Sequence, residues 1–99
     1  MALGVLSRLA ALGIRVPDDV SVVGCDDVLY AAMCAPPLTT VAMPMELAGR
    51  VAVQLLLARH AKGAAPDIVH TRMQTHLIVR STTAPPTAWR RRPEPHPGA

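Results

Sequence analysis

The sequence predicts an α/β fold in which helices flank an incomplete parallel sheet. Short β-branched runs alternate with segments whose apolar residues recur at helical spacing, in the order helix, strand, short helix, strand, helix, strand. The run at 20–23 is almost continuously apolar, which is typical of a strand buried on both faces of a parallel sheet. Three short strands are too few for a complete doubly wound domain.

The first predicted helix covers residues 3–12, where leucine and alanine recur on one face. Gly13 follows at the position where a left-handed cap ends a helix. The proline and acidic residues of 16–19 predict a turn that leads into the strand at 20–23, which Gly24 closes. The chain therefore opens with a helix, a turn and a buried strand.

An alanine-rich stretch at 28–35 predicts one or two helical turns, ended by Pro36 and Pro37. Residues 38–42, rich in threonine and valine, predict a second short strand.

A longer helix is predicted at 44–61, with two adjacent i,i+4 rows of apolar residues and Gly63 just past its end. A third strand is predicted at 76–79. From Pro85 onward the chain has five prolines and no periodicity, so we expect residues 87–99 to form a disordered basic tail.

The charge pattern argues against a nucleic-acid surface in the folded part. The net charge of +3 comes from Arg90, Arg91 and Arg92 in the tail, while residues 1–86 are nearly neutral. No stretch reaches the ~18 apolar residues that cross a membrane, and Met1–Leu12 lacks the pattern of a signal peptide. We therefore expect a cytoplasmic protein with no membrane partner.

The sequence offers no constellation for catalysis, a cofactor or a metal. Cys25 and Cys34 have no second Cys or His at ligand spacing, and the four histidines are scattered. No glycine-rich phosphate loop and no nucleophile elbow occur. Arg80 is interpreted as the partner of a structural ion pair. We expect a protein that is not an enzyme, with free thiols, no metal and no cofactor.

Asp26 and Asp27 are the candidate functional pair, because they follow the first strand at the end where open α/β sheets bind ligands. An ionised carboxylate accepts several hydrogen bonds, so Asp26 is suited to ligand hydroxyls. The alternative is that one aspartate caps the short helix that follows. Both roles are compatible, with one aspartate in each.

Four ordered segments resemble regulators of the LacI/GalR family. Residues 13–27 resemble the family's G-x-x-V-P-x-D-V-S-V-V-G-F-D-D pattern, and residues 36–41 its P-x-L-T-T-V pattern. Residues 49–56 are similar to G-x-x-A-x-x-L-L, and residues 77–82 to L-I-x-R-x-S-T. The chain departs from the pattern at Cys25, where the family usually has an aromatic residue.

The resemblance implies a partial periplasmic-binding-protein-like fold of type I. It implies that residues 1–86 are the C-terminal part of a LacI-type sensor domain, with pieces of both lobes and without the helix-turn-helix headpiece. Asp26 would lie in the effector cleft. By position in the family, five residues would lie at the dimer interface: Leu3, Leu6, Ala10, Leu29 and Met33.

We therefore expect the C-terminal effector-sensing and dimerisation fragment of a sugar-responsive, DNA-binding transcriptional regulator. Its partners would be a small-molecule effector of the sugar class and a second copy or relative, with DNA bound only through the missing headpiece. Three alternatives remain open: a short interaction module that pairs with full-length relatives, a fragment of a solute-binding protein, and a truncated gene without function.

Overall fold

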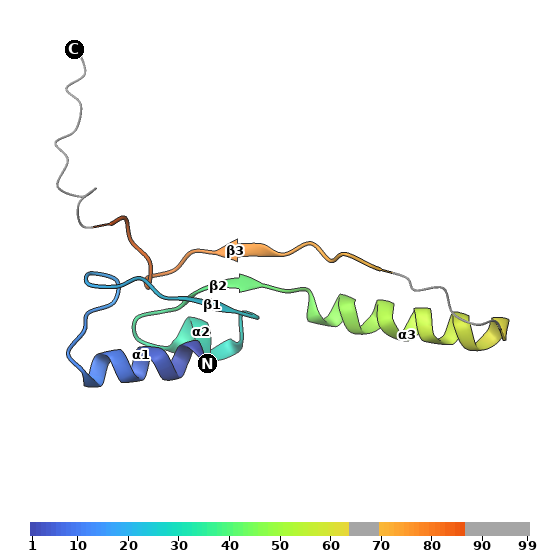
Figure 1. Cartoon of the computed structure of the whole chain (residues 1–99), viewed down its shortest axis with the longest axis horizontal. Helices are drawn as coiled ribbons and strands as arrows, with labels where there is room; N and C mark the ends of the chain where they lie inside the picture. The colour runs from blue at the N-terminus through green and yellow to red at the C-terminus, as the bar shows by residue number, and fades with distance from the viewer. Residues whose placement is uncertain (64–69, 87–99) are drawn as a thin grey trace, which may run out of the picture.

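The computed structural model describes residues 1–63 and 70–86 of the chain, so the predicted tail at 87–99 lies outside the described residues. Six elements follow one another in the predicted order (Figure 1): α1 (Ala2–Ala11), β1 (Val23–Cys25), α2 (Leu29–Met33), β2 (Thr39–Ala42), α3 (Met45–Lys62) and β3 (His76–Ile78). The predicted α/β alternation is confirmed. Among the described residues, no helix combines the length and the apolar character that crossing a bilayer requires.

The three strands form one mixed sheet in the order β1-β2-β3. β1 pairs with β2 in parallel, as predicted, and Cys25 lies opposite Val41. β3 pairs with β2 in antiparallel fashion, with Leu77 opposite Val41, so the predicted parallel arrangement holds for β1 and β2 but not for β3. The reason is the path of α3, which continues beyond the end of the sheet (Figure 1) and does not cross its face as a parallel connection requires.

The first strand differs from its prediction in position and in burial. β1 begins at Val23 because its ladder partner β2 begins at Thr39, and the preceding Val22 instead donates its N–H to the carbonyl of Thr82 at 2.9 Å. β1 is an edge strand, and the side chain of Val23 remains 53% exposed. The expectation that this run is buried on both faces is therefore wrong for the described residues.

The glycine caps are confirmed at both long helices. Gly13 has φ +72°, its N–H donates to the carbonyl of Ala10, and the N–H of Ile14 donates to the carbonyl of Leu9, both at 3.0 Å. This pair of bonds is the Schellman arrangement that satisfies the last carbonyls of a helix. Gly63, with φ +60°, ends α3 in the same left-handed conformation.

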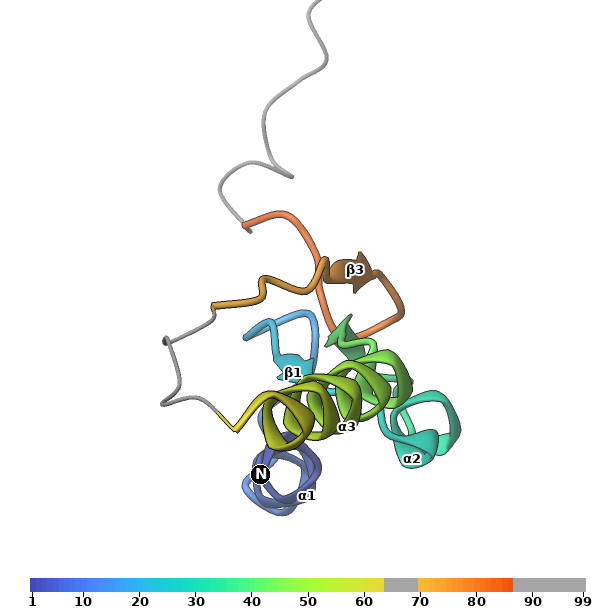
Figure 2. The ribbon, with the colours of Figure 1, turned by 90° about the vertical axis from the view of Figure 1, so that its right-hand side faces the viewer.

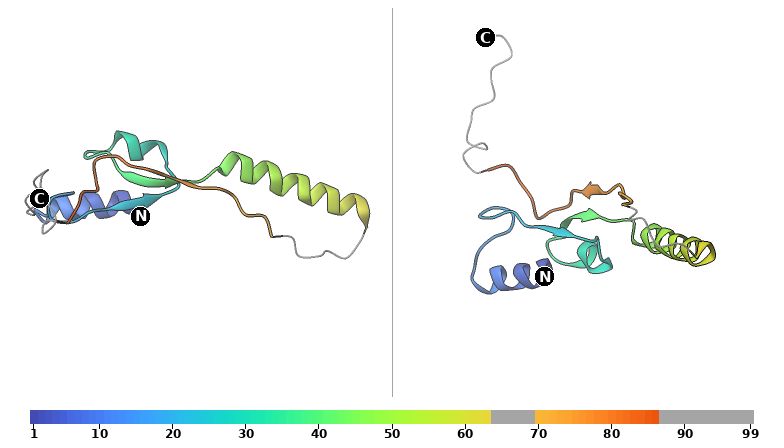
Figure 3. Two further views of the ribbon diagram at one scale, coloured as in Figure 1. Left: turned by 90° about the horizontal axis from the view of Figure 1, so that it is seen from above. Right: turned by 45° about the vertical axis from the view of Figure 1, so that its right-hand side comes forward.

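The core lies at one end of the molecule. Leu6 of α1, Ala31 of α2 and Leu38 before β2 are buried against one another. None of the α3 residues whose side chains are described is buried, and Leu56 and Leu57 are 67% and 63% exposed. Figure 3 shows α3 projecting away from α1 and α2, and Figure 2 views α3 end-on. Its apolar rows have no partner among the described residues.

Candidate functional site

The two aspartates form the turn that leaves β1. Asp26 and Asp27 have φ values of +77° and +44°, a left-handed conformation that aspartate tolerates better than most residues. The N–H of Asp26 donates to the carbonyl of Val41 at 2.8 Å, so the turn is tied to the end of β2. The Asp26 residue is exposed at the carboxyl end of the parallel pair, which is where the sequence placed a ligand contact.

Asp27 has a structural role instead. Its carboxylate oxygen Oδ1 lies 2.8 Å from Nη2 of Arg80, and both side chains are mostly buried. Arg80 also donates from Nη1 to the carbonyl of Leu38 at 2.9 Å. The predicted structural ion pair of Arg80 is thus confirmed, and it connects the turn after β1 to the segment after β3.

Neither aspartate caps α2, so the helix-cap alternative is wrong. The N-cap position is Val28, and no side chain donates or accepts a cap hydrogen bond there. Asp27 is held by Arg80, and the Asp26 oxygen Oδ1 lies 3.5 Å from the Sγ of Cys25. Both carboxylates are therefore engaged away from the N-terminus of the helix.

A buried threonine network lies beside this turn, and apart from two threonine-rich runs no sequence pattern predicted it. Thr82 Oγ1 accepts from the N–H of Thr39 at 2.8 Å and donates to the carbonyl of Val22 at 2.7 Å. Thr39 Oγ1 accepts from the N–H of Arg80 at 2.9 Å. We interpreted Thr39 and Thr40 only as strand formers, but pairing with residues some forty positions away is invisible in a local pattern.

A long apolar groove of about 850 Å³ leads along β1 to Asp26. Leu3 and Leu9 of α1 and Gly24 of β1 are among its lining residues. A Cβ at Gly24 would come within 2.7 Å of Leu38 Cδ2, so the close approach of the strand to the core requires glycine. The exposed carboxylate at the end of an apolar groove can accept hydrogen bonds from a polyhydroxyl ligand.

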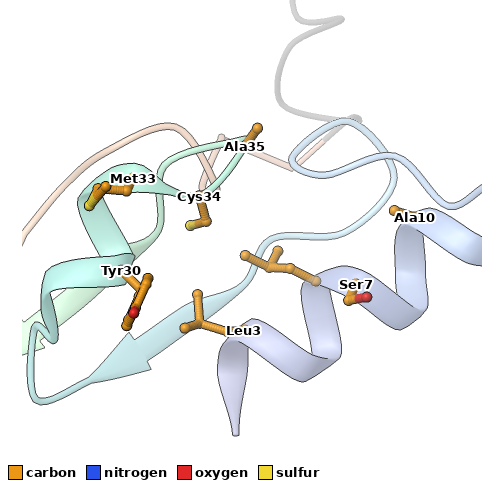
Figure 4. A pocket seen from close by; sticks show the side chains of 8 residues that line it. Leu3, Ser7, Ala10, Tyr30, Met33, Cys34 and Ala35 are labelled. Atoms are coloured by element: carbon orange, nitrogen blue, oxygen red, sulfur yellow. The ribbon is translucent and has the colours of Figure 1, made fainter.

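The residues predicted for a dimer interface gather at a second groove, of about 460 Å³, between α1 and α2 (Figure 4). Leu3 and Ala10 line it from α1, and Tyr30 and Met33 from α2. Leu6 also lines it but is 8% exposed and belongs to the core. Leu29 lies on α2 outside the lining and is 74% exposed.

The described residues contain no group of three or more His, Cys, Asp or Glu side chains that could hold a metal ion. Cys25 and Cys34 are free thiols, as expected. Asp26 contributes one exposed residue to the lining of the apolar groove.

The fold defines a class of ligand-binding domain. The family model of the periplasmic binding protein-like domain matches residues 1–83. The HTH-type transcriptional repressor PurR of Vibrio vulnificus (strain CMCP6) is 43% identical over 82 residues, which are 83% of this chain and 24% of that protein. The chain thus spans about a quarter of the length of this curated relative.

Two solved structures that resemble this chain identify the class of protein more narrowly. The transcriptional regulator CelR in complex with cellobiose is 42% identical, with a TM-score of 0.75 over 82% of this chain and 24% of CelR. A LacI family regulator from Enterococcus faecalis V583 with bound ribose is 37% identical, with a TM-score of 0.77 over 85% of this chain and 31% of that chain. The chain belongs to the periplasmic binding protein-like family, in the branch carried by LacI family transcriptional regulators.

Proposed function

We propose that the chain is the C-terminal part of the effector-sensing domain of a sugar-responsive transcriptional regulator in the cytoplasm. Residues 1–86 then supply pieces of two lobes, and DNA is bound only by a headpiece outside this chain. The relatives are named as transcriptional regulators, and the two solved structures hold cellobiose and ribose. In such a domain a sugar acts by favouring one of two arrangements of the lobes.

The position of Asp26 is the observation that supports this proposal. It is the one residue of the aspartate pair whose carboxylate is free of the Arg80 ion pair, and it stands at the end of the groove beside β1. Its contact with the Sγ of Cys25, at 3.5 Å, is weak, so this carboxylate can accept from sugar hydroxyls without breaking an ion pair. A hydrogen bond to a charged group contributes about 1.5–3 kcal/mol, so its loss is measurable.

The test is a chimera in which residues 1–83 replace the matching segment of CelR, with cellobiose binding measured by calorimetry. We expect the chimera to bind cellobiose and the Asp26→Asn variant to bind it at least about tenfold more weakly. Glu46→Gln is the matched control, because Glu46 is an exposed carboxylate whose ion pair with Arg50 lies within the same helix α3. Equal affinity of the Asp26→Asn and Glu46→Gln chimeras would contradict the effector role.

We further propose that the groove between α1 and α2 belongs to a dimer surface. Its rim carries Leu3, Tyr30 and Met33, and the last two are 66% and 69% exposed. Exposed apolar and aromatic side chains around a groove are typical of protein interfaces. Met33→Glu would place a charge in this surface, and we expect it to convert a dimeric chimera to a monomer in sedimentation velocity, whereas Ala32→Glu on the same helix serves as the control.

The same groove supports a second candidate, a short module that pairs with full-length relatives. The two candidates differ in the size of the native protein, which an antibody against residues 87–99 would detect in cell lysate. A band several times heavier than 10.5 kDa supports the regulator. A band at 10.5 kDa, together with co-elution with a full-length relative in gel filtration, supports the module.

A further inference from the structure

Asp26 is held in an uncommon backbone conformation. Its φ of +77°, like the +44° of Asp27, lies in the left-handed region that only a few per cent of non-glycine residues occupy, with aspartate several-fold enriched. The N–H of Asp26 donates to the carbonyl of Val41 at 2.8 Å, which fixes the start of the turn. Among the described residues, the Asp26 carboxylate is bonded only weakly, to the Sγ of Cys25 at 3.5 Å. The restraints on the next residue therefore decide where this carboxylate lies.

Asp27 fixes the end of the turn through two contacts. Its N–H donates to Oγ1 of Thr40 at 3.3 Å, which is a long bond for an N–H donor. Its carboxylate oxygen Oδ1 lies 2.8 Å from Nη2 of Arg80. This oxygen is buried, and no other described group donates a hydrogen bond to it. The guanidinium of Arg80 therefore offsets the buried negative charge and is the stronger of the two restraints on Asp27.

The Arg80 side chain can restrain Asp27 because Arg80 is itself fixed to the sheet. Nη1 of Arg80 donates to the carbonyl of Leu38 at 2.9 Å, and the backbone N–H of Arg80 donates to Oγ1 of Thr39 at 2.9 Å. The Arg80 and Asp27 side chains are 19% and 26% exposed, so salt and water screen this pair less than a surface pair. The segment around the start of β2 thus holds the guanidinium, and the guanidinium holds Asp27.

Removal of the guanidinium would leave a buried carboxylate oxygen without a partner. A buried unpaired charge is costly, so the Asp27 side chain would turn toward water. Because Asp26 and Asp27 are consecutive residues of one left-handed turn, this movement would release Asp26 from its φ of +77°. An aspartate without such a restraint occupies the left-handed region only about one tenth of the time.

We infer that Arg80 is a positioning residue for Asp26: through its ion pair with Asp27 it holds the turn that presents the Asp26 carboxylate at the end of the groove. The effect on sugar affinity rests on the proposed function, whereas the effect on the turn is independent of any sugar. The apparent affinity of a site falls with the fraction of molecules in the competent conformation. A fall to about one tenth therefore predicts a loss of up to about tenfold.

The first measurement uses the full chain without sugar. The intraresidue nuclear Overhauser effect between the HN and Hα protons of Asp26 is strong at positive φ, because the two protons are then close together. We expect Arg80→Met to weaken this signal, since Asp27 loses its partner. Arg80→Lys keeps the positive charge and should retain the signal. An unchanged signal in Arg80→Met would overturn the inference.

The second measurement uses the CelR chimera, with cellobiose binding followed by calorimetry. We expect Arg80→Met to bind about five- to tenfold more weakly and Arg80→Lys to bind within about twofold of the unaltered chimera. Adding Asp27→Asn to Arg80→Met should restore the affinity to within about twofold, because no unpaired charge remains and asparagine also tolerates the left-handed conformation. Weak binding by the folded double variant would overturn the inference, because Arg80 would then act through the Leu38 carbonyl alone. This variant keeps the test decisive if Arg80→Met by itself does not fold.

Thr82→Val is the matched control for lost stability. Thr82 bonds to Val22 and Thr39 at the start of the strand pair, whereas the turn lies at its end. The variant should therefore change the cellobiose affinity by less than about twofold. An equal loss in Thr82→Val and Arg80→Met would overturn the inference. Unaltered affinity in Asp26→Asn would instead refute the proposed function, and the Asp26 signal in the full chain would still decide whether Arg80 holds the turn.

Discussion

Apolar side chains are buried at one end of the molecule and exposed at the other. The end that contains α1, α2, β1 and β2 has its own core around Leu6, Ala31 and Leu38, and the segment after β3 is bonded to it through Arg80 and Thr82. α3 extends from the other end as an isolated helix (Figure 1). Sequence periodicity alone does not distinguish these two situations.

The two ends differ in whether their apolar side chains find packing partners among the described residues. Isolated helices are marginal in water, and most helix stability in proteins comes from packing of an apolar face. α3 has a glycine C-cap and several leucines, but its apolar rows face no other described element. The core end has partners for its buried groups within this chain. We therefore expect substitutions at the core end to change stability far more than substitutions on α3.

The largest expected contrast is between two leucines. Leu38 is 3% exposed in the core, and Leu38→Ala should lower the free energy of unfolding by about 3 kcal/mol through lost burial and a cavity. Leu57 is 63% exposed on α3, and Leu57→Ala should change it by less than about 0.5 kcal/mol. Urea denaturation followed by the amide signals of Thr39 and Thr40 measures both. Equal losses would mean that α3 packs on the core.

The next contrast separates the contribution of the Thr82 hydroxyl from that of the size of its side chain. Thr82→Val has the same shape but leaves the N–H of Thr39 and the carbonyl of Val22 without a side-chain partner. A buried group left unpaired costs about 1–3 kcal/mol. Because Val22 is only half-buried, we expect a total loss in the lower part of the range for two groups, about 2–3 kcal/mol, in the same denaturation experiment. Thr82→Ser keeps the hydroxyl and should lose about 1 kcal/mol. A loss in Thr82→Ser as large as in Thr82→Val would assign the role to the methyl group.

Replacing one glycine at each end of the molecule by alanine tests both ends with a single added methyl group. Gly24→Ala pushes a Cβ to within 2.7 Å of the buried Leu38 side chain, and we expect a loss of about 1–2 kcal/mol from overpacking. Gly49 lies inside α3 with nothing within 4 Å of the added atom. Gly49→Ala should therefore stabilise the helix by about 1 kcal/mol through helix propensity, seen as increased far-ultraviolet circular dichroism. A decrease would indicate that a partner closely approaches α3.

The local elements were predictable from the sequence because their signals are local. The Gly13 and Gly63 caps, the proline-ended short helix and the β-branched run of β2 each depend on neighbouring residues. Long-range features were not predictable. The antiparallel direction of β3 depends on the path of α3, and the register of β1 depends on where β2 begins.

The candidate site likewise combines a feature that local sequence predicts with features that depend on long-range contacts. The position of Asp26 after a strand pointed to a ligand contact, and the structure leaves its carboxylate exposed at the end of a groove. The different role of Asp27 depends on Arg80, which lies more than fifty residues away in the chain. The bond from Arg80 to the Leu38 carbonyl is likewise a long-range contact, which a local pattern does not contain.

The smallest expected effect concerns the turn before β1, where Asp19 accepts hydrogen bonds from Arg15. The Arg15 side chain donates from Nη2 at 2.7 Å and the Arg15 backbone N–H at 2.8 Å, and these bonds lower the pKa of Asp19 from 3.8 to about 2. The folded state therefore holds the proton more weakly than the unfolded state does. The contribution to stability is present above about pH 4 and is lost as the pH falls toward the folded pKa of about 2.

Carbon-detected NMR titration of the Asp19 carboxyl group measures this directly. We expect a pKa near 2 in the unaltered chain and a higher value in Arg15→Gln, which removes the side-chain donors and keeps the backbone donor. The stability difference between the unaltered chain and Asp19→Asn should shrink as the pH is lowered from about 4 to 2. The effect should be small, because exposed ion pairs contribute little and the Arg15 side chain is 70% exposed. An unchanged Asp19 pKa in Arg15→Gln would assign the lowering to the backbone bond alone.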